Sequence, residues 1–575
     1  MTKEWLVAAP IKPELIDQSL GLNPLLWQLL FNRGLTDVRE IKAFFANDWT
    51  LSSHEPLSFQ QMERAVAAVV AEIKAGRPIA ICGDYDADGV TATAVLQEVL
   101  TTLKAEVKVW IPSRLQDGYG LNRKIIEEIK NAGCALLITV DNGIRSKEEV
   151  AHAKSLGLQV IVTDHHAAPD DSADWPDCLI INPMLPGETY PFKYLAGVGV
   201  AFKLANALVA ASNLTPAVKE KIIKRVLDLV AVGTVADCVN VLGENRLLIK
   251  EGLRELNARR RLGLSELIKI SQLSGEINEW NISWQLAPRL NVAGRLDHAN
   301  TAYELLITGN SEEAAALARR LNEKNIERQE ETARVLAECR AELEAGEMSD
   351  KILLASEPVL RGLTGGKPWP EGVIGLVAGR LGERYGRPAL VICASGNKIK
   401  GSGRSIEDYD IVALLGKVSQ YLERFGGHKA ACGFTVKAGQ LAVFMSAVQK
   451  IAQAELAAAD LKPKLKIDAE LALDDINERL VEEINRCAPF GQGNNQPLFV
   501  SFNLIIRDKV TMGLENQHVK FRFGNFWAVA FGEAAKWQTL NLGERVDVVY
   551  QLEINRYNGQ TNVQLRVVDI RPSLS

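Results

Sequence analysis

Between about Pro56 and Arg260, short apolar runs alternate with segments in which apolar residues recur every three or four positions. The short runs predict strands at 77–82, 107–111, 135–140 and 159–163. The amphipathic segments predict helices at 90–103, 122–131 and 146–156. Strands rich in Val, Ile and Leu that alternate with helices indicate a parallel sheet covered on both faces. Such a sheet binds ligands beyond the carboxyl ends of its strands.

The remaining pattern predicts four further parts. A Pro-interrupted N-terminal stretch indicates a helical arm, and an Ala-rich, charge-rich run at 311–345 predicts one long helix, which we expect to be a solvated spacer. A second strand–helix pattern begins near Lys351. Five short C-terminal runs predict an OB-type β-barrel, at 498–506, 518–523, 527–531, 546–554 and 561–568. We therefore expect an arm, an α/β domain, a connecting segment, a second α/β domain and a barrel at 1–50, 51–262, 263–347, 348–460 and 461–575.

The composition narrows the class of protein. Hydrophobic residues make up 47% of the 575 and charged residues 24%, which is ordinary for a globular protein. No apolar run approaches the roughly 18 residues of a membrane span, and the N-terminus lacks the features of a secretory signal. The eight cysteines form no CxxC pair, so we expect a reducing, cytoplasmic setting without membrane contact. A net charge of -5 argues against a uniformly basic surface but allows a local basic groove.

Three carboxylates follow the first predicted strand at alternate positions, namely Asp84, Asp86 and Asp88. They project to one side of a turn, where they would repel one another and raise each other's pKa. A hard cation such as Mg2+ or Mn2+, which prefers oxygen ligands, relieves that repulsion. An acidic turn that caps the next helix explains this motif equally well when it is taken alone.

Three more acidic motifs favour the metal site. Asp141 begins an Asp-Asn-Gly sequence after one strand, and Asp164 precedes His165 and His166 after another, in a chain with only seven histidines. Asp237 interrupts an apolar stretch, where a partly buried charge needs a partner or a metal. Four such motifs in one α/β domain therefore favour a metal site over an acidic turn that only caps a helix.

These motifs resemble, in order and spacing, those of the DHH phosphoesterase superfamily. The resemblance implies two divalent cations, Mn2+ or Mg2+, and hydrolysis of phosphoester or phosphoanhydride bonds. Carried over by position, it implies metal ligands at Asp84, Asp86, Asp88, Asp141, His165 and Asp237. Asp141 would bridge the cations and act in catalysis with Asp84 and His166, the last contacting the phosphate or leaving group. Cys82 stands where pyrophosphatase-like members have a His, which argues against pyrophosphatase activity.

Segments further along the chain combine glycines with cations, and two of them, at 400–405 and 425–434, are predicted to be Gly-rich loops. Open backbone amides beside a cationic side chain can cradle a phosphate, although Arg289 and Arg295 serve structural ion pairs equally well. The residues expected to bind substrate are Arg114, Arg289, Asn291, Arg295, Ser402, Gly403, Arg404, Gly426, Gly427, His428 and Lys429. The segments around Arg289 and Gly427 resemble the RecJ family of single-strand-specific exonucleases, from about residue 51 to the C-terminus. In this family the second α/β domain is the DHH-associated, substrate-binding domain.

The RecJ resemblance implies a 5′-to-3′ exonuclease that degrades single-stranded DNA to mononucleotides in DNA repair and recombination. It implies a monomer that works with a single-strand-binding protein and a helicase. A terminal 5′-phosphate would rest among Arg114, Arg295, Ser402 and Arg404. The barrel mixes cationic and aromatic residues, as proteins that bind single strands do. These residues are Lys520, Phe521, Arg522, Phe523, Phe526 and Trp527. Most of the aromatic ones, however, should fill the core of the barrel.

Two other functions compete with this interpretation. A DHH phosphodiesterase for oligoribonucleotides or cyclic dinucleotides would use the same metal motifs. The bridging helix and the barrel argue against it, because small substrates need no extended binding tract. A replication scaffold without catalysis would tolerate decayed motifs, whereas every motif carboxylate and both histidines are intact here.

Overall fold

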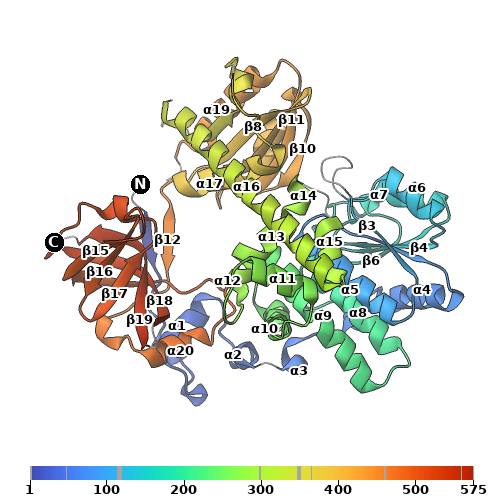
Figure 1. Ribbon diagram of the computed structural model, residues 1–575, viewed down its shortest axis with the longest axis horizontal. Helices are drawn as coiled ribbons and strands as arrows, with labels where there is room; N and C mark the ends of the chain where they lie inside the picture. Colours follow the sequence, from blue (N-terminus) through green and yellow to red (C-terminus); the bar gives the residue numbers. More distant parts are fainter. Residues whose placement is uncertain are drawn as a thin grey trace. The chain divides into compact units, whose positions relative to one another are not determined.

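The computed structural model describes residues 3–46, 48–112, 120–296, 300–345, 351–363, 365–458, 461–557 and 560–573. The chain forms two compact units, whose elements Figure 1 labels. The larger unit contains Trp5–Asn291, Ala299–Ala318 and Lys466–Ser575, and the smaller one contains Met1–Glu4, Val292–His298 and Arg319–Leu465. The finer division into five parts remains a proposal.

The predicted parallel sheet lies in the larger unit. Its strands run in the order β3-β2-β4-β5-β6 and pair in parallel throughout. They are β2 (Ile79–Cys82), β3 (Val107–Trp110), β4 (Leu136–Val140), β5 (Gln159–Thr163) and β6 (Leu179–Ile181). The chain passes from β2 to β3 on one side and returns to β4 on the other. The carboxyl ends of β2 and β4 therefore form a topological switch point, where α/β sheets bind ligands.

Helices cover both faces of this sheet, as predicted (Figure 1). One face packs against α6 (Arg123–Asn131) and α7 (Lys147–Ser155), whose apolar residues join those of β2 and β4 in one core. The other face contacts α4 (Met62–Ala75), α5 (Ala87–Thr102) and α8 (Gly197–Ala211). Because both faces are covered, every residue of β2 and β4 is buried.

Further helices surround α5 and α8. They are α9 (Pro216–Ala236), α10 (Gly243–Asn257), α11 (Leu262–Ile270), α12 (Glu279–Asn281), a π-helical turn (Ile282–Leu286), α13 (Ala287–Asn291) and α15 (Asn300–Ile307). The N-terminal arm contains β1 (Glu4–Val7), α1 (Pro24–Asn32), α2 (Val38–Phe45) and α3 (Trp49–Ser52). Arg246 of α10 is buried and donates to the carbonyls of Phe44 (2.9 Å) and Cys487 (2.8 Å). These hydrogen bonds connect both the N-terminal arm and the start of the C-terminal region to α10.

The C-terminal region folds into a seven-stranded sheet in the order β13-β14-β18-β19-β17-β16-β15. The strands are β13 (Ala469–Glu470), β14 (Phe499–Ile505), β15 (Asp508–Met512), β16 (His518–Phe523), β17 (Phe526–Ala530), β18 (Arg545–Tyr557) and β19 (Gln560–Pro572), and α20 (Glu478–Asn485) packs beside them. The sequence did not predict β13 and β15, because β13 is short and β15 has little apolar character. Phe521 and Phe523 are fully buried, as predicted, whereas Phe526 and Trp527 are partly exposed.

The smaller unit holds a five-stranded mixed sheet in the order β10-β11-β9-β8-β7. The strands are β7 (Leu353–Ser356), β8 (Ala389–Ser395), β9 (Lys398–Arg404), β10 (Leu422–His428) and β11 (Ala431–Val436). Only β7 and β8 pair in parallel. Besides α16 (Ser311–Ala345), which is described below, the helices of this unit include α14 (Ala293–Leu296), α17 (Glu371–Tyr385), α18 (Ile411–Lys417) and α19 (Leu441–Glu455).

Two expectations about this unit were wrong. The Gly-rich segments predicted as loops are strands, because their glycines admit large neighbouring side chains. A Cβ at Gly401 would lie 2.1 Å from the ring of Phe434. The long helix α16 (Ser311–Ala345) has the predicted bounds, but it is more than a solvated spacer, since Val335 and Cys339 lie in a core with Trp369. No helix in the described ranges is long and apolar enough to cross a membrane.

Candidate metal centre

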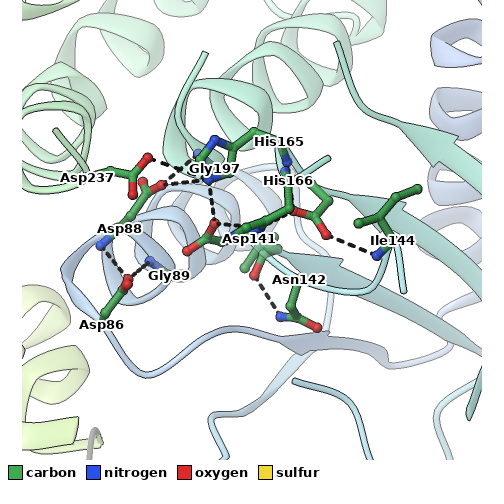
Figure 2. A network of polar contacts seen from close by, with 12 residues as sticks. Asp86, Asp88, Gly89, Asp141, Asn142, Ile144, His165, His166, Gly197 and Asp237 are labelled. Atoms are coloured by element: carbon green, nitrogen blue, oxygen red, sulfur yellow. Dashed lines mark hydrogen bonds and ion pairs between the residues drawn. The ribbon is translucent and has the colours of Figure 1, made fainter. Parts of the chain in front are cut away.

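The segment that leads from β2 into the first turn of α5 carries the first three carboxylates, and Figure 2 shows two of them, Asp86 and Asp88. The Oδ1 atom of Asp86 caps α5 by accepting the N–H groups of Asp88 and Gly89, both at 3.0 Å. The carboxylate of Asp88 accepts the N–H groups of Gly197 (2.7 Å) and Val198 (2.8 Å) at the start of α8. Backbone donors from two helices therefore fix the orientation of this pair of carboxylates.

Asp141 follows β4 in a left-handed conformation, with φ at 62°. Beside it, the Nδ2 atom of Asn142 donates to the carbonyls of Cys82 (3.2 Å) and Val140 (2.9 Å) and ties the ends of β2 and β4 together. A Cβ at Gly197 would lie 2.5 Å from Oδ1 of Asp141. The helix α8 thus approaches Asp141 closely because residue 197 is a glycine.

His165 points into the cluster of carboxylates (Figure 2). Its Nε2 atom lies 3.2 Å from Oδ1 of Asp141, 3.5 Å from Oδ2 of Asp237 and 3.9 Å from Oδ2 of Asp88. Asp237 comes from elsewhere in the fold, as the residue that directly follows α9. Four segments of the larger unit therefore contribute to one site.

Asp164 is a buried residue that the sequence did not single out for a role. Its Oδ1 atom contacts Nδ1 of His166 at 2.7 Å and accepts the N–H of His165 at 2.7 Å, while Oδ2 accepts the N–H of Ile144 at 3.0 Å. Its position at the end of β5, directly before two histidines, was the feature of the sequence that could have indicated this role. It orients the histidine pair.

The pKa values of three buried carboxylates are raised above the ordinary value for Asp. Burial, followed by the charge of Asp86, raises the pKa of Asp88 to about 7. Burial and the charge of Asp88 raise the pKa of Asp237 to about 9. Burial and the surrounding carboxylates also raise the pKa of Asp141 well above its ordinary value. Without a counter-charge these groups retain protons, so the arrangement favours a bound cation.

The two histidines differ in charge. Burial and the charge of His166 lower the pKa of His165 to about 4, which keeps His165 neutral, as a metal ligand must be. Burial also opposes the charged form of His166, but the hydrogen bond and charge of Asp164 outweigh it and raise the pKa of His166 to about 9. His166 is therefore a cation at neutral pH.

The donor atoms fall into three groups, within each of which all atoms lie within 4.8 Å of one another. They are Asp84, Asp86 and Asp141; Asp88, His165 and Asp237; and Asp141, His165 and His166. Carboxylate oxygens, which most of these residues supply, suit Mn2+ or Mg2+. All six predicted ligands thus converge, and their chemistry fits the predicted cations.

Two other predicted site residues of the larger unit, Arg289 and Asn291, lie on α13. The Oδ1 atom of Asn291 accepts the N–H of Ala87 at 2.7 Å, so Asn291 supports the loop that holds Asp86 and Asp88. The Nη1 atom of Arg289 donates to the carbonyl of Gln285 at 2.6 Å. Arg114 and the side chain of Arg295 lie outside the described residues.

The remaining predicted substrate-binding residues share one sheet of the smaller unit. On β9, Ser402 donates to the carbonyl of Cys432 (3.2 Å), and Arg404 donates to that of Gly403 (2.9 Å). The start of α17 lies against them, because a Cβ at Gly375 would be 3.0 Å from Oγ of Ser402. Gly426, Gly427, His428 and Lys429 are exposed on and just after β10.

Comparison with known proteins identifies the class. Residues 78–234 match the N-terminal domain of the DHH family, residues 355–454 match the DHHA1 domain, and residues 467–569 match the RecJ OB domain. This domain set confirms the predicted fold class, namely two α/β domains and an OB-type domain. With the acidic site, it defines the protein as a phosphoesterase of the DHH type.

Full-length relatives identify the family. The single-stranded-DNA-specific exonuclease RecJ of Bacillus subtilis is 36% identical over 98% of this chain and 70% of its own length. Crystal structures of RecJ from Thermus thermophilus with Mn2+ and with Mg2+ cover the whole chain, with TM-scores of 0.84 and 0.78 at 28% and 27% identity. The alignments cover 80% and 79% of those chains. The chain belongs to the RecJ family, which confirms the resemblance seen in the sequence.

Proposed function

We propose that this protein is a 5′-to-3′ exonuclease that hydrolyses single-stranded DNA to mononucleotides and acts in DNA repair and recombination. The observation that carries the proposal is the convergence of six metal-donor residues at the switch point of the parallel sheet. Relatives that share nearly the whole chain bear the name of this activity. The polarity rests on family membership alone.

We assign the donors to two cation sites. Asp88, His165 and Asp237 would hold one ion, and Asp84, Asp86 and Asp141 would hold the other. The Oδ1 atom of Asp141 also lies 3.2 Å from Nε2 of His165, a donor of the other group, which supports the bridging position expected for Asp141. Two such cations, when bound, neutralise the scissile phosphate and lower the pKa of a bound water.

The protein's own residues orient and protonate the reacting groups. The Nδ1 atom of His166 is engaged by Asp164, so the Nε2 atom carries the proton that faces other partners. We propose that this N–H donates to the phosphate or to the leaving 3′ oxygen. The backbone donors of Gly197 and Val198 hold Asp88 in place throughout the reaction.

We propose that substrate binding extends beyond the metal centre. Ser402, Gly403, Arg404 and residues 426–429 of the smaller unit offer hydroxyl, guanidinium and backbone groups suited to phosphate. Of these, Ser402 and Arg404 would receive a terminal 5′-phosphate together with Arg114 and Arg295. Arg289 would contact another phosphate. In the OB domain, Lys520 lies 4.3 Å from the ring centroid of Trp527, and Arg522 pairs with Trp527 across strands. Such cation–aromatic surfaces bind single strands without reading sequence.

We further propose a monomer that receives its substrate from a single-strand-binding protein and a helicase. Family membership supports these partners.

A time course on single strands labelled at either end tests the function. With Mn2+, we expect early release of mononucleotide from the 5′ label, and loss of that release with EDTA or in Asp141→Asn. Early release from the 3′ label would reverse the polarity. Cleavage of short RNA or cyclic dinucleotides instead of DNA would assign the protein to the DHH phosphodiesterases of small substrates.

A further inference from the structure

Two tryptophans on one short segment are unusually exposed. Trp284 is 67% exposed and Trp280 is 46% exposed. Among the other tryptophans in the described part of the chain, Trp27 (2%) and Trp369 (1%) are fully buried, and none of the rest is exposed. An exposed pair of large aromatic rings is therefore a distinct feature of this segment.

The segment that carries them is firmly packed on its other face. Ile282, Leu286 and Leu290 recur every four residues and are buried, and the π-helical turn and α13 contact α9. Trp280 and Trp284 repeat with the same spacing on the exposed side. The rings are thus presented by an anchored helix, and the π-helical turn is a feature common at functional sites.

The same segment leads directly to the metal centre. α13 ends at Asn291, whose Oδ1 atom binds the N–H of Ala87 between Asp86 and Asp88. Asn291 lies seven positions after Trp284, a rise of about 10 Å along a helix. That length corresponds to about three stacked nucleotides. Arg289 lies between Trp284 and Asn291 in the sequence, and its guanidinium donates to the carbonyl of Gln285, next to Trp284.

We propose that Trp284, with Trp280 beside it, is a stacking platform for bases of the single strand adjacent to the scissile phosphate. This inference rests on the proposed function, because it takes single-stranded nucleic acid as the occupant. Every base has an aromatic face, so stacking on indole holds a strand without selecting sequence. The platform keeps the strand in line with the metal centre between successive cleavages.

The test compares Trp284→Ala and Trp284→Phe with the parent. As a matched control, Phe31→Ala removes an aromatic ring that is 38% exposed on α1. The affinity for a fluorescent oligothymidylate of twelve nucleotides, measured in EDTA, should fall about tenfold in Trp284→Ala. It should recover largely in Trp284→Phe and remain unchanged in Phe31→Ala. With Mn2+, KM for the oligonucleotide should rise by a similar factor while kcat stays within twofold.

A spectroscopic measurement separates stacking from a structural role. Unlabelled oligothymidylate should quench the tryptophan emission of the parent, and Trp284→Phe should lose much of that quenching. Parent-like binding by Trp284→Ala, or unchanged emission of the parent on saturation, would overturn the platform. If the parent binds the oligonucleotide but never degrades it with Mn2+, the proposed function fails and the binding result still stands. Altered self-association of Trp284→Ala with unchanged DNA binding would identify a protein interface instead.

Discussion

Two edges of the molecule are built in opposite ways. The metal edge is the carboxyl end of the parallel sheet in the larger unit, where the predicted metal ligands lie. The β10 edge is the outer strand of the sheet in the smaller unit. At the metal edge, Asp88, Asp141 and Asp164 are nearly completely buried, and backbone donors hold Asp88 and Asp164. Along β10, residues 423–428 are exposed on an edge strand. Both regions nevertheless depend on a glycine at a close approach, Gly197 in the first and Gly427 in the second.

This difference in burial predicts how a substitution affects each region. A buried group of donors loses its geometry when one residue moves by an ångström, and metal affinity is lost with it. An exposed edge strand offers backbone and side chains to a ligand and can adjust to a small displacement. We therefore expect changes at the metal edge to affect turnover, and changes at β10 to affect substrate binding.

The largest expected effect comes from Gly197→Ala. Its Cβ would lie 2.5 Å from Oδ1 of Asp141, and the displacement would also disturb the N–H that binds Asp88. We expect Mn2+ affinity, measured by calorimetry, to fall about 100-fold, with a comparable loss of kcat/KM. Gly199→Ala is the control, since its Cβ would meet only the side chain of Leu195, at 3.2 Å, just before the start of the same helix. Equal Mn2+ affinity in the two variants would contradict the close packing of α8 on Asp141.

The second prediction concerns pH. In the metal-free folded protein Asp237 retains its proton up to about pH 9, whereas the unfolded chain loses it near its ordinary value of 3.8. The folded state therefore binds more protons in this window, and its stability relative to the unfolded state falls as pH rises. A cation must displace those protons, so apparent Mn2+ affinity should rise with pH, by up to about tenfold per pH unit between 6 and 8.

Thermal unfolding checks this prediction. The increase in Tm caused by a fixed Mn2+ concentration should be larger at pH 8 than at pH 6. Asp237→Asn should weaken Mn2+ binding and flatten its pH dependence. A Tm increase that is independent of pH would show that the site is already deprotonated before the metal binds.

The sequence predicted the metal edge well for a physical reason. Parallel strands place their carboxyl ends together, so acidic motifs after β2, β4 and β5 had to meet. The contributions of Gly197 and Val198 could not be foreseen, because they are backbone amides brought by a helix about 110 residues away from Asp88. The Gly-rich strands were mistaken for loops because side chains from neighbouring strands, such as Phe434, fill the space at Gly401.

The smallest expected effect is that of Gly427→Ala. Residue 427 has φ at 141°, and a Cβ there would lie 2.2 Å from the carbonyl oxygen of Ala431 on the paired strand. The strain should displace His428 and Lys429 at the turn between β10 and β11 without reaching the metal donors. We expect KM for single-stranded DNA to rise about tenfold, with kcat within a factor of two to three and Mn2+ affinity unchanged.

Gly433→Ala is the matched control for this last change. Gly433 lies on the same hairpin, pairs with Gly426, and has open space where its Cβ would project. It should leave KM within about twofold of the parent, because no backbone displacement is needed. A loss of kcat in Gly427→Ala as large as that in Gly197→Ala would mean that the edge of β10 takes part in the chemical step. The contrast between a buried catalytic edge and an exposed binding edge would then no longer hold.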